Sequence, residues 1–143
     1  WPSRAVTLMS TQLISSATLI FGAWMGLYSM LKPQWGSKTV GLVPIAGHSE
    51  GQSEFRATFG GLFLAGHAAT LILLWALDQM SAPIVTLPLA AAWIGSGCGR
   101  ILSILKDDGA ATRQNWIWVG FEYAMGVLIC APAIALFVSI KFA

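Results

Sequence analysis

Charge is what this sequence of 143 residues has least of. Lys and Arg number eight and Asp and Glu six, which together is 10% of the chain, whereas ordinary globular domains carry about 25% charged residues. The net charge is only +2, and no run of Lys or Arg is present. We therefore expect no nucleic-acid partner, because such a partner requires a concentrated basic patch.

Cysteine and catalytic motifs are also scarce. The two cysteines, Cys98 and Cys130, form no CxxC pair and no Cys/His cluster with the spacing of metal ligands. We interpret both as small apolar packing residues rather than redox groups. The sequence contains no GxSxG, Walker A, GxGxxG or HExxH pattern. We predict no metal site and no cofactor, and the sequence contains no catalytic signature, which leaves open whether the protein is an enzyme.

What the sequence has in abundance is long apolar stretches, and 56% of its residues are hydrophobic. Four stretches of about 23 to 27 residues cover 5–31, 55–77, 83–105 and 116–140. A bilayer core about 30 Å thick is crossed by about 20 helical residues, and a chain this small cannot bury four such helices in water. The sequence predicts an all-α membrane protein: one domain, 1–143, forming a four-transmembrane-helix bundle with both termini on the same side.

Two details refine this prediction. The first stretch is too long for the core of a signal peptide, so we interpret it as a retained helix, although the chain begins at Trp1 rather than at a methionine. Pro88 and Pro132 fall inside the third and fourth stretches, where proline removes a backbone donor and is expected to kink the helix.

The basic residues predict an orientation. Connections 32–53 and 106–115 contain four of them, and the opposite side has only two, near the chain ends: Lys32, Lys38, Lys106 and Arg113 against Arg4 and Lys141. The positive-inside rule then places both connections in the cytoplasm and both termini outside it. Within the first connection, the mildly apolar segment 40–46 is suited to lie against the membrane surface.

Small residues recur at helical spacing in all four stretches. Lipid provides no hydrophobic force between helices, so close packing of small residues must hold them together. The glycines that we expect at helix contacts are Gly22, Gly26, Gly60, Gly95, Gly99 and Gly126.

A few charged residues fall within or at the ends of the apolar stretches. Arg100 and Glu122 lie at matching depth, about 9–12 Å from the same end of their helices, and an unpaired charge at that depth is costly. We therefore predict that they pair, and that Glu54 and Arg56 complete a polar cluster. Two interpretations stay open, a ligand-binding or proton-handling site and a structural clamp, and we favour the clamp because the four charges balance. His67, deeper in the second stretch, is interpreted as a hydrogen-bonded core residue rather than a haem ligand.

The same residues carry a resemblance to a known family. An acid and an arginine open the second helix before a glycine pair, in the run EFRATFGG at 54–61; Gly99 and Arg100 follow late in the third helix, and Glu122 and Gly126 lie early in the fourth. With these features the chain resembles a family of small bacterial four-helix membrane proteins, catalogued as a domain of unknown function and similar to the DoxX-like group. The resemblance implies a multi-pass protein of the bacterial inner membrane. It implies no activity and no catalytic residue.

Two functional hypotheses follow. The first is an accessory or scaffold subunit of a larger membrane complex, respiratory or photosynthetic, whose partners are membrane lipids and other membrane-protein subunits. The alternative is a small-ligand binding protein, carrier or membrane enzyme that uses the intramembrane Arg/Glu cluster. In either case the outer faces offer room for a lipid, a quinone or a pigment.

Overall fold

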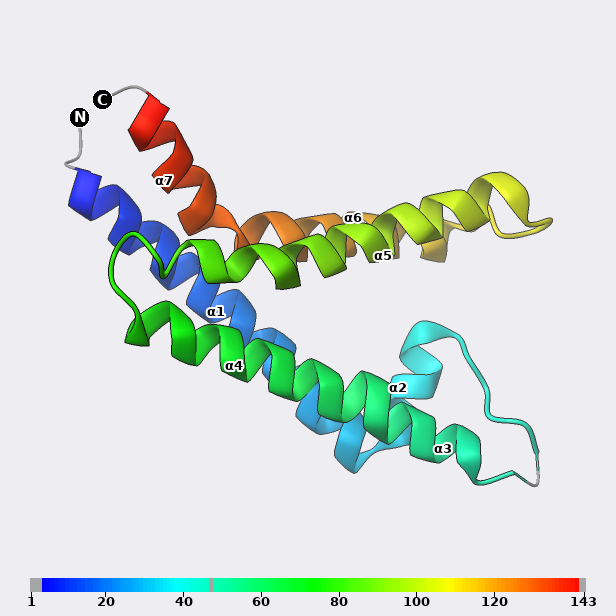
Figure 1. Cartoon of the computed structure of the whole chain (residues 1–143). Helices are drawn as coiled ribbons and strands as arrows, with labels where there is room; N and C mark the ends of the chain where they lie inside the picture. The colour runs from blue at the N-terminus through cyan, green and yellow to red at the C-terminus, as the bar shows by residue number, and fades with distance from the viewer. Residues whose placement is uncertain (1–3, 47, 142–143) are drawn as a thin grey trace. The chain divides into compact units, whose positions relative to one another are not determined.

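The computed structural model describes residues 4–46 and 48–141, and every regular element in them is helical (Figure 1). Trp1 and Gly47 lie outside the described residues. The elements in chain order are α1 (Arg4–Leu31), α2 (Pro33–Val40), α3 (Glu50–Glu54), the π-helix η1 (Phe55–Leu62), α4 (Phe63–Ala76), the 3₁₀-helix η2 (Ile84–Thr86), α5 (Leu87–Lys106), α6 (Arg113–Ile129) and α7 (Ala131–Lys141).

The apolar helices have the lengths that a membrane protein needs. Three continuous helical runs in the described residues are long and apolar enough to cross a membrane: Ala5–Leu31, Glu50–Ala76 and Ile84–Lys106. A fourth crossing exists if α6 and α7 form one span, since they meet at a bend of 54°. Large apolar side chains are exposed along all of these helices, as expected of surfaces that face lipid.

The bend between α6 and α7 lies beside Pro132. The last helical donor before the bend is the Cys130 N–H, which reaches the Gly126 carbonyl at 3.1 Å. Pro132 cannot donate and therefore sits in the first turn of the next helix, where no donor is required. The bend frees the Ile129 carbonyl, and the buried Ser15 hydroxyl of α1 donates to it at 2.8 Å.

The position of Pro88 in its helix differs from the predicted one. It lies in the first turn of α5, directly after η2, instead of inside a helix. Its missing N–H is therefore not needed, and Ile84–Lys106 continues as one span. The helix type changes from 3₁₀ to α at this position, and the kink expected there stays a prediction.

The first connection is more structured than predicted. Pro33 starts α2 in the position where proline is favoured, and α2 ends at Gly41, whose φ of 73° is left-handed and whose N–H bonds the Ser37 carbonyl. The second apolar helix also begins earlier than predicted, at Glu50, where an acidic residue in the first turn suits the helix dipole. It continues through η1, an eight-residue π-helix, into α4.

The chain divides into two compact units. The first unit combines the chain up to Thr18 with the residues from Leu73 onward, and the second unit is Leu19–Ile72. In the first unit the core includes Leu74, Ile129 and Leu136, and the Trp75 indole donates to the Ser16 hydroxyl at 2.9 Å.

Candidate functional site

The turn between α5 and α6 sets these two helices against each other. Ser103 donates to the Asp107 carboxylate at 2.6 Å as α5 ends, and Gly109 turns the chain with a φ of 78°. Thr112 then caps α6 by accepting from the Asn115 N–H at 3.1 Å. This cap starts α6 at Arg113, three residues before the predicted start.

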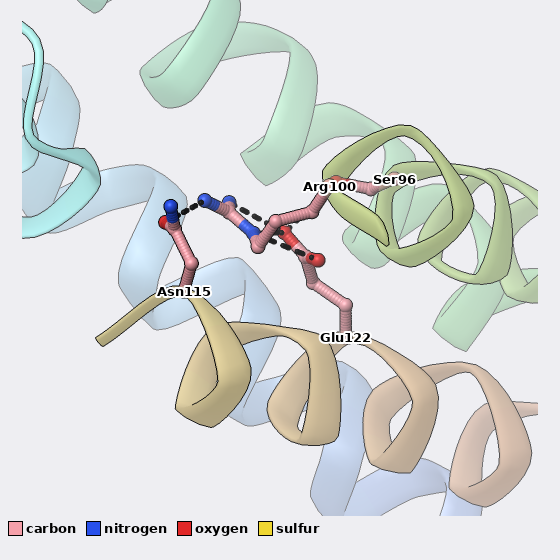
Figure 2. Close-up of polar contacts among 4 residues, drawn as sticks. All are labelled: Ser96, Arg100, Asn115 and Glu122. Atoms are coloured by element: carbon pink, nitrogen blue, oxygen red, sulfur yellow. Dashed lines mark hydrogen bonds and ion pairs between the residues drawn. The ribbon is translucent and has the colours of Figure 1, made fainter. Parts of the chain in front are cut away.

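Arg100 of α5 and Glu122 of α6 meet across this helix pair (Figure 2). The Arg100 Nε donates to both carboxylate oxygens at 3.1 Å, and Nη2 donates to Oε1 at 2.7 Å. The Glu122 side chain is 5% exposed and that of Arg100 23%. The ion pair expected between the two residues is therefore present, with the multiply bonded geometry that makes an Arg–carboxylate pair strong.

Two further side chains complete the hydrogen bonding of this pair, as Figure 2 shows. Ser96, one turn before Arg100, donates to Glu122 Oε1 at 3.0 Å. Asn115 accepts from Arg100 Nη1 at 3.3 Å and donates its own amide to the Ala110 carbonyl at 2.8 Å. We call Ser96, Arg100, Asn115 and Glu122 the polar clamp. Asn115 is not among the residues predicted from the sequence, although its spacing of two helical turns before Glu122 places it on the same helix face.

The polar clamp is complete without a ligand. All three guanidinium nitrogens of Arg100 donate to protein oxygens, and both oxygens of Glu122 accept. Among the described side chains, no buried nitrogen or oxygen lacks a hydrogen-bond partner. One positive and one negative charge cancel, so this geometry holds α5 and α6 in register and leaves no excess charge for an ion.

Glycines bring the same two helices close together. A Cβ on Gly97 would lie 2.9 Å from the Tyr123 ring, and one on Gly126 would lie 2.6 Å from Ile94. The thiol of Cys98 is 3.1 Å from the Tyr123 hydroxyl. The closest approach of α5 to α6 on the α5 side is therefore at Gly97.

Gly95 and Gly99 do not pack as expected. A Cβ at either position would meet nothing within 4 Å in the described chain, and both residues are exposed. The close contact on α5 is at Gly97 instead, because a shift of two residues turns a helical position by about 200°. The helix-packing role of Gly95 and Gly99 stays a prediction.

Glu54 and Arg56 lie in the second unit and have separate partners. The Arg56 guanidinium donates through Nη1 to the Met30 carbonyl at the end of α1, and the Thr58 hydroxyl donates to the Glu54 carboxylate. A cation at the C-terminal end of a helix is favoured by the helix dipole. In the described residues no ion pair joins Glu54 to Arg56. Arg100 and Glu122 belong to the first unit, so the four-residue cluster stays a prediction.

In the second unit α1 packs on η1 and α4 through glycines. A Cβ on Gly26 would lie 2.4 Å from the Leu64 backbone nitrogen, and one on Gly60 would lie 2.8 Å from the Met30 Cα. A Cβ on Gly22 would lie 2.1 Å from the ring of His67. Two of these contacts are with backbone atoms, so the two helices approach as closely as only glycine permits.

His67 is a buried residue of this contact. Its Nδ1 lies 2.7 Å from the Phe63 carbonyl, one turn earlier on the same helix. In the described residues no group of three or more His, Cys, Asp and Glu is arranged to hold a metal ion. The geometry is that of a packed and hydrogen-bonded histidine.

Comparison with known families shows to which family the chain belongs. The sequence model of a domain of unknown function (DUF4345) matches residues 10–131, which is most of the chain, and the protein therefore belongs to this family. No curated protein and no solved structure matches the chain. The matched range contains both members of the Arg100–Glu122 pair together with Glu54 and Arg56.

Proposed function

We propose that this DUF4345 protein is an integral membrane protein that acts as an accessory or scaffold subunit, packing α5 against a transmembrane helix of another membrane protein. The observation that carries the proposal is an exposed face of small residues on α5. Ala91, Gly95 and Gly99 recur at intervals of four and are all exposed. The same face includes the exposed Ala92 and Cys98.

Contact with lipid does not require small side chains on such a face. The exposed surfaces of other helices carry large side chains, such as Leu62 of η1 and Ile72 of α4, and on α5 large exposed apolar side chains follow only after Gly99, at Leu102 and Leu105. Small residues at a spacing of four let two helix backbones approach closely enough for extensive van der Waals contact, which is the main attraction between helices in lipid. The glycines that contact another helix of this chain have this role inside the chain, and Gly95 and Gly99 offer the same surface to a second protein.

The alternative, a ligand site at Arg100 and Glu122, has less support. An anionic ligand needs an unneutralised cation, and a proton-handling site needs a carboxylate free to change partners. The carboxylate of Glu122 is bound by Arg100 and by Ser96. This arrangement favours a clamp that holds α5 rigid for packing.

We further propose that the protein lies in the bacterial inner membrane with the connections 32–53 and 106–115 in the cytoplasm. This orientation requires α6 and α7 to form one bent span, because four crossings return the chain end to the side of its start. Its support is the bias of Lys and Arg toward these two connections. Labelling of single cysteines placed at Lys38 and at Asp78 by a membrane-impermeant reagent would test it, with only the second labelled from the periplasm.

The proposed packing is tested by the size of the protein after mild detergent extraction from its own membrane. The test variant is Gly95→Leu with Gly99→Leu, which covers the small face without touching the polar clamp. Leucine favours a helix by about 0.8–1 kcal/mol over glycine, so each change should leave the fold intact. The matched control is Gly120→Leu on α6, where a Cβ also meets nothing within 4 Å.

We expect the unaltered protein and the Gly120→Leu control to migrate in a defined complex with another membrane protein, identified by mass spectrometry. The doubly substituted protein should migrate as the free 15.2 kDa chain in its micelle. Migration of the unaltered protein alone or as a homo-oligomer would overturn the proposal. So would a complex that survives both leucines.

A further inference from the structure

The second unit contains a pocket outside the polar clamp. It has a volume of about 370 Å³ and is formed by α2, the loop after it and the start of the next helix. Its polar lining comes from five side chains, and the buried Phe55 also lines it. These five side chains are Gln34, Ser37, Lys38, His48 and Gln52.

Lys38 is the one lysine or arginine among the lining residues of this pocket, and no acidic residue lines it. The nearby acids are Glu50 and Glu54 of α3. The Glu50 carboxylate lies 3.7 Å from His48 Nδ1, and the Glu54 carboxylate accepts from the Thr58 hydroxyl. Lys38 is exposed at the pocket and makes no ion pair among the described residues. The pocket therefore suits an anionic group.

The loop on the other side of the pocket is apolar and unusually exposed. Val43 is 87% exposed and Ile45 75% exposed, and both line the pocket. Leu42 is exposed beside them. Three large apolar side chains on one short loop are unfavourable in water, because none of them is removed from the solvent. They are suited to the boundary between lipid headgroups and acyl chains.

Aromatic residues gather in the last part of α1 and the start of α2. Trp24, Tyr28 and Trp35 form a cluster with ring centroids 5.0–6.2 Å apart. The Lys32 ammonium lies 5.5 Å from the centre of the Tyr28 ring. Trp and Tyr with flanking Lys are typical of the membrane–water interface. Because α2 starts directly after Lys32, the pocket lies where α1 leaves the apolar core.

We propose that this pocket binds the phosphate headgroup of an anionic phospholipid from the surrounding leaflet. Lys38 supplies the charge, and the amides of Gln34 and Gln52 supply hydrogen bonds to the phosphate and the glycerol. Val43 and Ile45 lie along the acyl chains of the same lipid. A lipid fits better than a soluble phosphate because the apolar half of the pocket would leave a soluble anion without contacts.

The experiment is native mass spectrometry of the full chain in detergent with equal amounts of phosphatidylglycerol and phosphatidylcholine. The test variant is Lys38→Gln, an exposed position at which the fold should be unaffected. The matched control is Lys106→Gln, an exposed lysine at the end of α5. One lysine near an anionic surface changes affinity by about fivefold.

We expect phosphatidylglycerol to be retained in preference to phosphatidylcholine, and Lys38→Gln to lower its retention about fivefold while Lys106→Gln leaves it unchanged. A second variant, Val43→Gln with Ile45→Gln, should also lower retention. Excess glycerol phosphate should not displace the lipid. Equal retention of both lipids, or equal losses in the two lysine variants, would overturn the proposal. Displacement by glycerol phosphate would show a soluble anion to be the ligand instead and would equally overturn it.

Discussion

The two units hold their helices together by different chemistry. In the first unit α5 and α6 are joined by the buried Arg100–Glu122 pair, with Gly97 against the Tyr123 ring. In the second unit α1 meets η1 and α4 through Gly26 and Gly60, which lie against backbone atoms. The polar link there is the Arg56 guanidinium on the Met30 carbonyl, and it lies at the exposed end of α1.

This difference separates two ways of fixing register in lipid. Hydrogen bonds of the polar clamp are directional, so a slip of one residue would leave a charge unpaired in an apolar medium. Glycine contacts depend on shape alone, so they set the closest distance between two helices and fix register only by the positions of neighbouring bulky side chains. The first unit should therefore be more sensitive to loss of a charge, and the second to gain of a single methyl group.

The largest effect is expected from Glu122→Leu. Loss of the carboxylate leaves the Arg100 guanidinium without its counter-charge, and breaking a buried pair costs about 3–5 kcal/mol. Because the Arg100 side chain is 23% exposed, we expect the lower end, about 3 kcal/mol of unfolding free energy. Denaturant titration in detergent micelles measures this loss.

The double variant Arg100→Leu with Glu122→Leu tests whether the unpaired charge causes the loss of stability in Glu122→Leu. Replacing both charges by apolar side chains removes the unpaired group, so most of the lost stability should return. A double variant as unstable as the single one would mean that the hydrogen bonds themselves, rather than charge balance, hold α5 to α6.

A smaller effect is expected from Gly26→Ala in the second unit. The added methyl would lie 2.4 Å from the Leu64 backbone nitrogen, and a backbone atom cannot turn aside as a side chain can. Overpacking of this kind costs about 1–3 kcal/mol, and we expect about 2. The matched control is Gly61→Ala, where the nearest atom would be 3.7 Å away. Equal stability of the two variants would refute the close contact between α1 and α4.

A still smaller effect is expected from alanine on α5. At Gly97 the methyl meets the Tyr123 ring at 2.9 Å, and a ring can shift, so we expect a loss of about 1 kcal/mol. At Gly95 it meets nothing within 4 Å in the described chain, and alanine should be neutral or stabilise the helix by up to about 1 kcal/mol. Thermal unfolding of the two variants side by side tests the register of α5. A Gly95→Ala protein that unfolds at a lower temperature than the Gly97→Ala protein would contradict this register.

The smallest effect concerns Asp78, in the turn after α4. Hydrogen bonds from the Ser81 hydroxyl and from the N–H groups of Met80 and Ser81 lower the pKa of Asp78 below its usual value. A lowered folded-state pKa contributes stability above the unfolded pKa of about 3.9 that is lost as the pH falls through the folded value. Asp78→Asn keeps an oxygen acceptor and should flatten this part of the pH dependence below about pH 4. Identical acid profiles for the two proteins would show that the turn does not depend on the charge.

Much of the fold followed from local pattern. Apolar stretches predict membrane-length helices because their only requirement is to satisfy the backbone internally in lipid. The Arg100–Glu122 pair was also predictable, since two opposite charges at one depth have few other partners. The contact at Gly97, rather than at Gly95 or Gly99, was not predictable because a small residue has the same appearance in sequence whether it faces a helix of its own chain or the outside.

Other features depended on contacts between distant residues. The bend at Cys130 is stabilised by Ser15, which is 114 positions away in the chain, and Asn115 belongs to the polar clamp only because the turn before α6 carries it to Arg100. The pocket beside Lys38 requires α2, which no apolar periodicity indicated because α2 is short and polar.

The sequence by itself determined that this is a helical protein suited to a membrane and that its few buried charges must be paired. Both results depend on composition and on the cost of polar groups in lipid, which act on each segment separately. Only the tertiary structure decided which glycines touch, which side chains complete the clamp and where a pocket forms. These depend on the rotation of each helix about its own axis. Because successive residues are turned by about 100°, the packing between helices, and not the composition, decides which residues face a neighbouring helix.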